Sequence, residues 1–203
     1  MKRIGITGGI GAGKSAVSHW LRINGIPVYD SDTEAKRLMN ESQDIRSALI
    51  EKMGQDIYCN GTLDCKRMAQ LIFADPQLLS FVNSVVHPAV ISDFMGWSYS
   101  QGCEVVFVES AILFDCGLKD VLDGVVFVDA PEDIRIERAM KRDGAKRDAI
   151  ERRVKSQKVD SSRADWIVDN GGTLEDTERQ IQRIASIQCW IEGQVTPSDS
   201  KKK

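Results

Sequence analysis

Five short runs of apolar, largely β-branched residues recur along the chain, and each ends near a turn residue or an acidic residue. Two of them, Val105–Val108 and Val125–Val128, are apolar at every position. Unbroken apolar runs are typical of strands in a parallel sheet that is covered on both faces, whereas half-exposed strands alternate. The pattern predicts strands at 3–7, 26–29, 104–109, 124–129 and 165–168.

Helix-compatible stretches separate these runs, which predicts an α/β protein with a parallel five-stranded sheet flanked by helices. Between the second and third strands no strand pattern is found, and helices are expected instead at 35–40, 45–53, 67–74 and 77–86. We interpret 32–102 as an inserted helical lobe. The arginine-rich segment 131–158 predicts a helical pair that could close over a site as a lid. The core would then comprise 1–31, 103–130 and 159–195, followed by a flexible tail, 196–203.

Length and charge limit the classes of function. The 203 residues suffice for one folding unit with small inserted lobes, and the net charge of -3 gives no global attraction to nucleic acid or to a membrane. An anionic ligand must therefore be held by a local positive site. Five cysteines without a C-x-x-C pair disfavour a disulfide framework or a zinc site. The sequence shows no apolar signal core near its start and predicts no segment long enough to span a bilayer, so we expect a cytoplasmic protein.

The motif with the clearest chemistry is Gly8-x-x-x-x-Gly13-Lys14-Ser15, which follows a predicted strand and precedes a helix-compatible stretch. Its glycines let successive backbone N–H groups point at phosphate oxygens, and the helix N-terminus adds its positive dipole end. Lys14 would act on the terminal phosphates and the Ser15 hydroxyl would bind Mg²⁺. ATP and Mg²⁺ are thus the expected ligands, with contacts from Gly9, Gly11, Ala12, Gly13, Lys14, Ser15 and Ala16.

This loop identifies a nucleotide but not a reaction. No asparagine in the chain is followed by lysine, so the N-K-x-D motif that reads guanine is missing. The run Asp169–Gly172 formally matches the D-x-x-G of switch proteins, but it follows the last predicted strand rather than an early one. A kinase is therefore favoured, with another small-molecule kinase, such as a nucleoside monophosphate kinase, or a nucleotide-dependent switch as alternatives.

Acidic residues at strand ends are the candidates for metal binding and proton transfer. Glu109 ends the third predicted strand, where it could hold Mg²⁺, although Asp129 ends a similar strand. Asp32 follows the second strand and could act on an acceptor hydroxyl. Alternatively, Ser31-Asp32-Thr33-Glu34 reads as a capping box for the next helix.

Arg135, Arg138 and Arg142 have helical spacing and share one stripe of the predicted lid. Such a stripe is often only a solvated face. Placed opposite a triphosphate, it would neutralise charge as the phosphoryl group is transferred.

Taken together, these segments resemble the dephospho-coenzyme A kinase family. The similar segments, in the same order and at similar spacing, are Ile6–Ser15, Asp30–Asp32, Asn60–Asp64, Ile72–Phe73, Val86–Pro88, Ala111–Asp115, Arg138–Asp143 and Ala164–Gly171. The resemblance covers residues 2–172. It implies transfer of the γ-phosphoryl group of ATP to the 3′-hydroxyl of dephospho-coenzyme A in a nucleoside-monophosphate-kinase-like fold.

The resemblance also implies roles for individual residues. Asp32 would orient or deprotonate the ribose hydroxyl, and Lys14 and Arg138 would complete the catalytic set. Arg142 would contact ATP from the lid, and Asn170 would lie near adenine. His87 and Asp115 would contact the acceptor, although a histidine before a proline can merely shape a helix boundary.

Three positions depart from the family pattern. Ala111 stands where the pattern has proline, Asp115 where it has glutamate, and Cys65 where arginine usually follows Leu-Asp. The shorter carboxylate and the missing guanidinium affect contacts on the acceptor side unless Lys66 or Arg67 substitutes. ATP binding is not affected by them.

Overall fold

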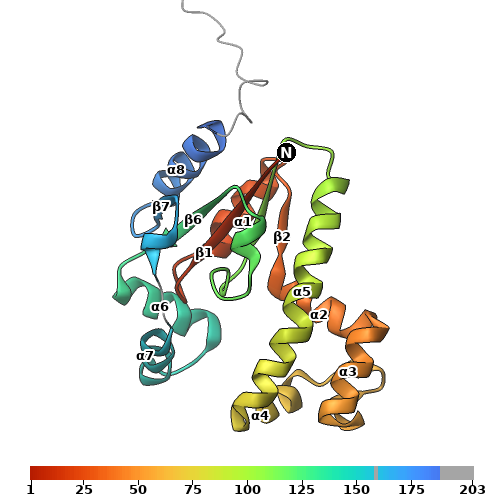
Figure 1. Cartoon of the computed structure of the whole chain (residues 1–203). Coiled ribbons are helices and arrows are strands. Elements are labelled where there is room, and N and C mark those ends of the chain that lie inside the picture. The colour runs from red at the N-terminus through yellow and green to blue at the C-terminus, as the bar shows by residue number, and fades with distance from the viewer. Residues whose placement is uncertain (158–159, 188–203) are drawn as a thin grey trace, which may run out of the picture.

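A sheet of five parallel strands runs through the centre of the chain in the order β2-β5-β1-β6-β7 (Figure 1). The computed structural model describes residues 1–157 and 160–187. The strand bounds are β1 Lys2–Gly8, β2 Val28–Asp30, β5 Val105–Glu109, β6 Gly124–Asp129 and β7 Trp166–Asp169. The predicted class is therefore confirmed. All four strand pairings are parallel, and the register brings Ile6 and Asp30 each opposite Glu109.

The sheet separates two apolar clusters, as the unbroken apolar strands predicted. Val105 and Phe107 of β5 face one cluster, which includes residues of α1 (Lys14–Ile23) and α8 (Leu174–Ile187). Val106 and Val108 face the other, which reaches into the helical lobe. Because each strand packs on both faces, the carboxyl edge of the sheet is held rigidly where the loops emerge.

The helical lobe comprises the four helices between β2 and β5 and extends to one side of the sheet (Figure 1). Their bounds are α2 Ser31–Glu41, α3 Gln43–Met53, α4 Cys65–Ala74 and α5 Pro76–Ser100. Buried Val82, Val86, Val90 and Phe94 of α5 belong to the same apolar cluster as Met39, Ile45 and Leu49 of α2 and α3. Helix α5 thus ties the lobe to the sheet.

The segment predicted to be a lid forms two helices, α6 (Glu132–Asp143) and α7 (Arg147–Ser156), joined by 144–146. We call this helical pair the lid. It has a small core of its own, made by Ile136, Ala139, Ile150 and Val154. Short 3-10 helices occupy Gln55–Ile57, Leu118–Val121 and Ser161–Arg163. The predicted tail, 196–203, lies outside the described residues, as do Cys189 and 188–195. The remaining cysteines, Cys59, Cys65, Cys103 and Cys116, are free thiols.

Helix α5 is longer than predicted. The sequence predicted a helix that ends at residue 86, just before His87 and Pro88, but the helix continues through Pro88 to Ser100. An internal proline costs about 3 kcal/mol. The apolar contacts that α5 makes on both sides of Pro88 offset this cost. The expectation that no segment is long enough to span a bilayer was also wrong, since α5 has the length and the apolar composition to do so. Core helices of soluble proteins share these two properties.

Three smaller differences concern local structure. The second strand begins at Val28 rather than Ile26, after Pro27, which has no N–H to donate. The last strand is shifted by one residue toward the carboxyl end. A short antiparallel hairpin, β3 (Tyr58–Cys59) and β4 (Thr62–Leu63), lies inside the lobe where no strand was predicted. Its turn residues Asn60 and Gly61 both have positive φ. Asn-Gly is a strong hairpin signal that the apolar pattern alone did not reveal.

The substitution Ile6→Ala in the central strand should lower the free energy of unfolding by about 2–5 kcal/mol, because the Ile6 side chain is fully buried. Ile23, at the end of α1, is 67% exposed and provides the matched control. Ile23→Ala should change stability by no more than about 0.5 kcal/mol. Urea unfolding followed by circular dichroism measures both. Equal losses in the two variants would contradict this assignment of the core.

Candidate active site

The phosphate loop connects β1 to α1 at the carboxyl edge of the sheet. Gly11 and Gly13 have φ of +75° and +98°. A Cβ on Gly13 would lie 2.0 Å from Asn170 Nδ2, and one on Gly11 would lie 2.0 Å from the Arg135 carbonyl oxygen. Only glycine is compatible with both the conformation and the space. The first turn of α1 has no side-chain cap and no acidic residue. The N–H groups of Ala16 and Val17 donate to the Gly13 carbonyl, which leaves those of Lys14 and Ser15 for an anion.

Asn170 supports this loop through a hydrogen bond to its backbone. Its Nδ2 donates a hydrogen bond to the Ala12 carbonyl at 2.7 Å, and its Oδ1 accepts one from the Thr177 hydroxyl at 2.9 Å. Its own carbonyl accepts a hydrogen bond from Arg138 Nη1 at 2.9 Å. The buried amide thus joins the phosphate loop to α8 and to the lid. Contact with adenine, which the family resemblance implied for Asn170, stays a prediction.

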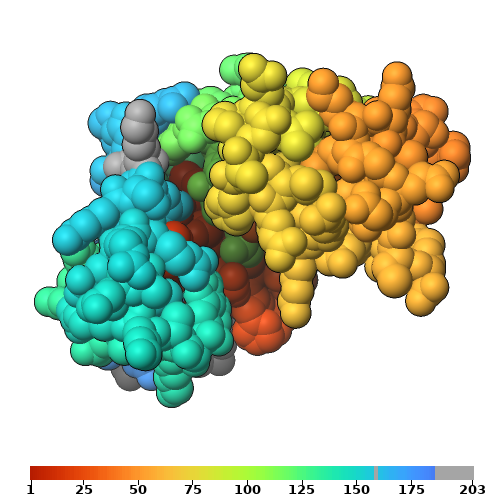
Figure 2. All heavy atoms as spheres, turned by 90° about the horizontal axis from the view of Figure 1, so that it is seen from below, coloured from red at the N-terminus to blue at the C-terminus, as the bar shows by residue number. Residues whose placement is uncertain are grey.

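A cavity of about 390 Å³ lies over the phosphate loop. Figure 2 views the molecule from this side and shows it hollowed between the lid and the lobe. The cavity is lined by residues from the loop, the sheet edge and the lid: Ile10, Gly11, Gly13, Lys14, Ser15, Asp32, Glu109, Ala111, Arg138, Ala139, Arg142 and Arg153. The structure therefore brings together the loop, both candidate carboxylates and the two predicted lid arginines. Gly9, Ala12 and Ala16 do not line it.

Lys14 and Ser15 line this cavity, and both side chains donate hydrogen bonds. Lys14 Nζ donates to the Gly8 and Gly9 carbonyls at 2.9 and 3.2 Å. Desolvation lowers the pKa of Lys14, while the nearby Glu109 and Asp32 carboxylates oppose this shift. The Ser15 hydroxyl donates to Glu109 Oε1 at 3.0 Å. Asp129, the alternative metal ligand, does not line the cavity, and its Oδ1 accepts from the Ala130 N–H.

The Ser15–Glu109 pair has the chemistry that Mg²⁺ requires. Mg²⁺ binds hard oxygen ligands, keeps several waters and usually takes only one or two protein groups beside substrate phosphates. A hydroxyl and a carboxylate oxygen 3.0 Å apart at the phosphate loop fit this pattern. No group of three or more His, Cys, Asp or Glu side chains that could hold a metal occurs among residues 1–157 and 160–187.

The capping box Ser31-Asp32-Thr33-Glu34, which the sequence left as an alternative, does not cap α2, because the helix already begins at Ser31. Asp30 caps α2, with its Oδ1 accepting from the N–H groups of Asp32 and Thr33 at 3.1 Å each. The Asp32 side chain faces the cleft. Protein atoms around the cleft desolvate its carboxyl and, with the Asp30 carboxylate, raise its pKa, while Lys14 acts in the opposite direction.

A second cavity, of about 210 Å³, adjoins the first at Asp32 and extends into the lobe. Its walls are mostly apolar and come from α2, α4, α5 and the segment after β5, including Met39, Ile72, Val86 and Ile112. His87 lines this cavity, and burial lowers the pKa of its imidazole. A histidine with a lowered pKa is neutral near pH 7.

Asp115 lines a third cavity, of about 230 Å³, together with Thr7, Phe114, Gln157 and Arg163. Arg163 stacks over the Phe114 ring, with its guanidinium carbon 4.5 Å from the ring centroid. Ala111 borders both this cavity and the one over the phosphate loop. The three cavities therefore meet around Asp32, Ala111 and Ile112. Cys65, the other departure from the family pattern, is exposed at the start of α4 and lines none of them.

The lid arginines divide into two groups. Arg138 and Arg142 reach the phosphate cavity, whereas Arg135 donates from Nε to the Ile10 carbonyl at 3.1 Å. Arg153 of α7 also lines the cavity, and the sequence reasoning missed it because it lies outside the predicted stripe. Asp143 accepts from Arg142 at 2.7 and 3.1 Å and from Arg153 at 2.7 Å, so it aligns both cations. These guanidinium groups lower the pKa of Asp143 to about 2.

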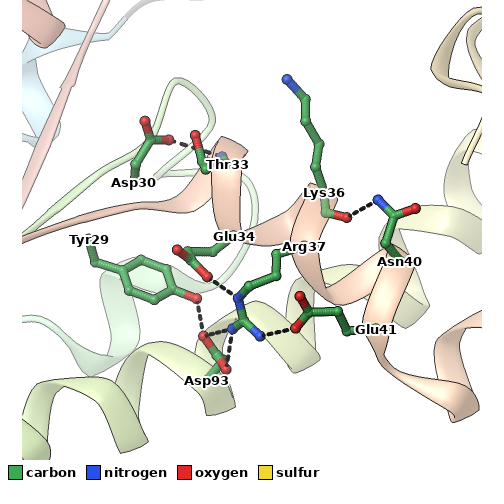
Figure 3. Close-up of polar contacts among 9 residues, drawn as sticks. All are labelled: Tyr29, Asp30, Thr33, Glu34, Lys36, Arg37, Asn40, Glu41 and Asp93. Atoms are coloured by element: carbon green, nitrogen blue, oxygen red, sulfur yellow. Dashed lines mark hydrogen bonds and ion pairs between the residues drawn. The ribbon is translucent and has the colours of Figure 1, made fainter. Parts of the chain in front are cut away.

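A polar cluster fixes α2, and with it Asp32, against α5 (Figure 3). Arg37 donates through Nη2 to both carboxylate oxygens of Asp93 at 2.8 and 2.9 Å, and it also pairs with Glu34 and Glu41. The Tyr29 hydroxyl donates to Asp93 at 2.7 Å. Burial and the Asp93 carboxylate raise the pKa of Tyr29, so it stays a donor at neutral pH. Nothing in the apolar pattern indicated this cluster, since Asp93 lies 64 residues from Tyr29 and 56 from Arg37.

Comparison with known proteins gives a consistent result. Residues 2–176 match the model of a protein family described as dephospho-CoA kinase. A dephospho-CoA kinase of Porphyromonas gingivalis is 48% identical over 164 residues, which cover 81% of each chain. A second, of Bacteroides fragilis, is 40% identical and aligns over 84% of this chain and 85% of its own. A crystal structure from Thermus thermophilus superposes with a TM-score of 0.78 at 34% identity, covering 92% of this chain and 97% of the other.

Removing Asp93 should destabilise the protein more than removing a carboxylate from an exposed ion pair. Asp93→Ala should cost about 1–2 kcal/mol, because Arg37 and Tyr29 both lose a partially buried partner. The matched control is Asp56→Ala, which removes the partner of Arg67 at a carboxylate that is 61% exposed. That change should cost less than about 1 kcal/mol. Denaturant unfolding of both variants tests this, and equal costs would show that the cluster does not hold α2.

Proposed function

The chain belongs to the dephospho-CoA kinase family, and on this premise we propose that it transfers the γ-phosphoryl group of ATP to the 3′-hydroxyl of dephospho-CoA, yielding coenzyme A and ADP. The observation that carries the proposal is the position of Asp32. Its carboxylate lies where the cavity over the phosphate loop meets the cavity of the lobe. A phosphoryl donor on one side and an acceptor hydroxyl on the other would meet at this side chain.

ATP binds with its phosphates on the loop of Gly8–Ser15 and the first turn of α1. The predicted contacts are Gly9, Gly11, Ala12, Gly13, Lys14, Ser15 and Ala16 from the loop, with Arg142 from the lid and Asn170 from the loop after β7. Lys14 leaves the Gly8 and Gly9 carbonyls, which it contacts in this structure, for the terminal phosphates. Ser15 and Glu109 would hold Mg²⁺, which would supply positive charge beside the phosphates.

Asp32 orients the acceptor hydroxyl and takes its proton as the bond to phosphorus forms. The raised pKa brings this carboxyl closer to the range in which it can both accept and later release a proton. Arg138, with Lys14, stabilises the charge that is spread over the transferred group. The cluster of Arg37, Asp93 and Tyr29 keeps α2 fixed, so that alignment contributes to the rate.

Dephospho-CoA occupies the lobe cavity and the cavity beside Asp115. The mostly apolar walls beside His87 suit an uncharged part of the acceptor, with the neutral imidazole as a hydrogen-bonding group. Asp115 and the stacked Arg163 and Phe114 provide polar and aromatic contacts on the other side. Residues Lys66 and Arg67, which could have replaced the arginine missing at Cys65, line neither cavity.

Both substrates are small molecules, and we place the protein in the cytoplasm without a nucleic acid or membrane partner. A net charge of -3 does not attract nucleic acid or an anionic membrane, so the positive groups act only on a ligand that lies close to them.

Purified protein with ATP and Mg²⁺ should phosphorylate dephospho-CoA and should leave AMP, CMP and shikimate nearly untouched. Product formation is measured by chromatography of coenzyme A and ADP. Chelating the metal with EDTA should abolish transfer, because the Ser15 hydroxyl and the Glu109 carboxylate carry no positive charge that could replace that of the metal. Phosphorylation of one of the other acceptors in place of dephospho-CoA would refute the proposed acceptor. Tight nucleotide binding without turnover would instead indicate a switch.

Asp32→Asn should lower kcat by about 10²–10⁴-fold while the Kd for ATP changes little, because the side chain acts on the acceptor. In the wild type, kcat/KM should fall as the pH drops through the Asp32 pKa, which lies above the ordinary 3.8 because burial disfavours the carboxylate. The variant should lose this acidic limb. The exposed Asp56→Asn serves as control and should keep it. An unchanged kcat in Asp32→Asn would show that Asp32 is not the catalytic base.

A further inference from the structure

Ile10, at the tip of the phosphate loop, is held by the lid at three points. Its side chain packs into the lid core, against a cluster formed by Ile136, Ala139, Ile150 and Val154. Its N–H donates to Gln157 Oε1 at 2.8 Å, and its carbonyl accepts from Arg135 Nε at 3.1 Å. The two hydrogen bonds come from α6 and from the residue that follows α7.

The loop also lies in close contact with the backbone and the side chain of Arg135 on α6. A Cβ on Gly11 would be 2.0 Å from the Arg135 carbonyl oxygen, and one on Gly9 would be 2.1 Å from Arg135 Nη2. This Nη2 is buried and has no hydrogen-bond partner among the residues that the structure describes. Lid movement that left the loop behind would therefore break both hydrogen bonds and expose the Ile10 side chain to water.

We infer that Ile10 and Gln157 are positioning residues that couple the lid to the phosphate loop, so that phosphates on the loop also fix the lid for the reaction proposed above. The lid then does not move independently of the phosphate loop. Its position and the direction of the loop amides change together. The effect on the rate of phosphoryl transfer rests on the proposed function. The coupling between lid and loop does not, because it needs only a bound nucleotide and can be measured without an acceptor.

Gln157 allows a discriminating set of variants. Gln157→Met keeps the length of the side chain and removes the acceptor, whereas Gln157→Glu keeps an oxygen that can accept from the Ile10 N–H. Gln101 supplies the matched control, since it makes a side-chain hydrogen bond to the Trp97 carbonyl at the end of α5, before β5. Gln101→Met should therefore behave like the wild type. Ile10→Ala tests the apolar contact separately, should Gln157→Met fail to fold.

Hydrogen exchange with and without ADP and Mg²⁺ measures the coupling directly. In the wild type, nucleotide should slow exchange both in α1 and in α7. In Gln157→Met and in Ile10→Ala, protection of α1 should persist while protection of α7 falls to half or less. Gln157→Glu should restore it. Full protection of α7 in Gln157→Met, or a Gln157→Glu variant as deficient as Gln157→Met, would overturn the inference. Arg142 and Arg153 are present in every variant, so their contribution stays constant.

Kinetics provide a second readout. Gln157→Met should lower kcat about tenfold with little change in the KM for ATP, and it should increase ATP hydrolysis without acceptor relative to transfer, because a loosened lid admits water. Gln157→Glu should recover most of kcat. An unaltered ratio of hydrolysis to transfer in Gln157→Met would argue against coupling. If the wild type did not phosphorylate dephospho-CoA, the proposed function would fail, while hydrogen exchange with ADP would still decide the coupling.

Discussion

The conformation of the phosphate loop is the constraint on which the other parts of this structure depend. Its backbone must present N–H groups to an anion, which requires positive φ at Gly11 and Gly13 and close contact with neighbouring groups. A loop whose N–H groups point at a ligand needs support from other parts of the chain. The central position of β1 supplies one part, and the buried amide of Asn170, reaching the Ala12 carbonyl from beyond β7, supplies another.

Much of the fold could be predicted because its signals are local. Unbroken apolar runs such as Val105–Val108 report strands buried on two faces, and the glycine spacing of the phosphate loop reports its ligand. Where a local signal misled, a tertiary contact explains why. Pro88 normally ends a helix, yet packing on both sides of it carries α5 on to Ser100. Asp30, one residue before the expected cap, takes the capping role and leaves Asp32 to the cleft.

The parts of the site that could not be predicted depend on residues far apart in the sequence. The pairing of Tyr29 and Arg37 with Asp93 requires α2 to lie along α5, which no periodicity in either segment indicates. Arg153 lines the phosphate cavity from α7, where it shares the Asp143 carboxylate with Arg142 of α6. Arg135 shares the helical stripe of the other lid arginines, but contact with the Ile10 carbonyl gives it a different role. Helical spacing identified the face and could not say what each residue on it touches.

The arrangement of charge follows from the topology of the sheet. Parallel pairing of β2 with β5 places Asp30 opposite Glu109, so the acidic groups gather at one part of the carboxyl edge. The cations come from outside the sheet, with Lys14 on α1 and the arginines on the lid. A chain with a net charge of -3 can thus hold a polyanion, since only the local field matters at this range. The lid that carries the arginines also contacts Ile10 of the phosphate loop. One element therefore positions both the guanidinium groups and the backbone N–H groups of the loop.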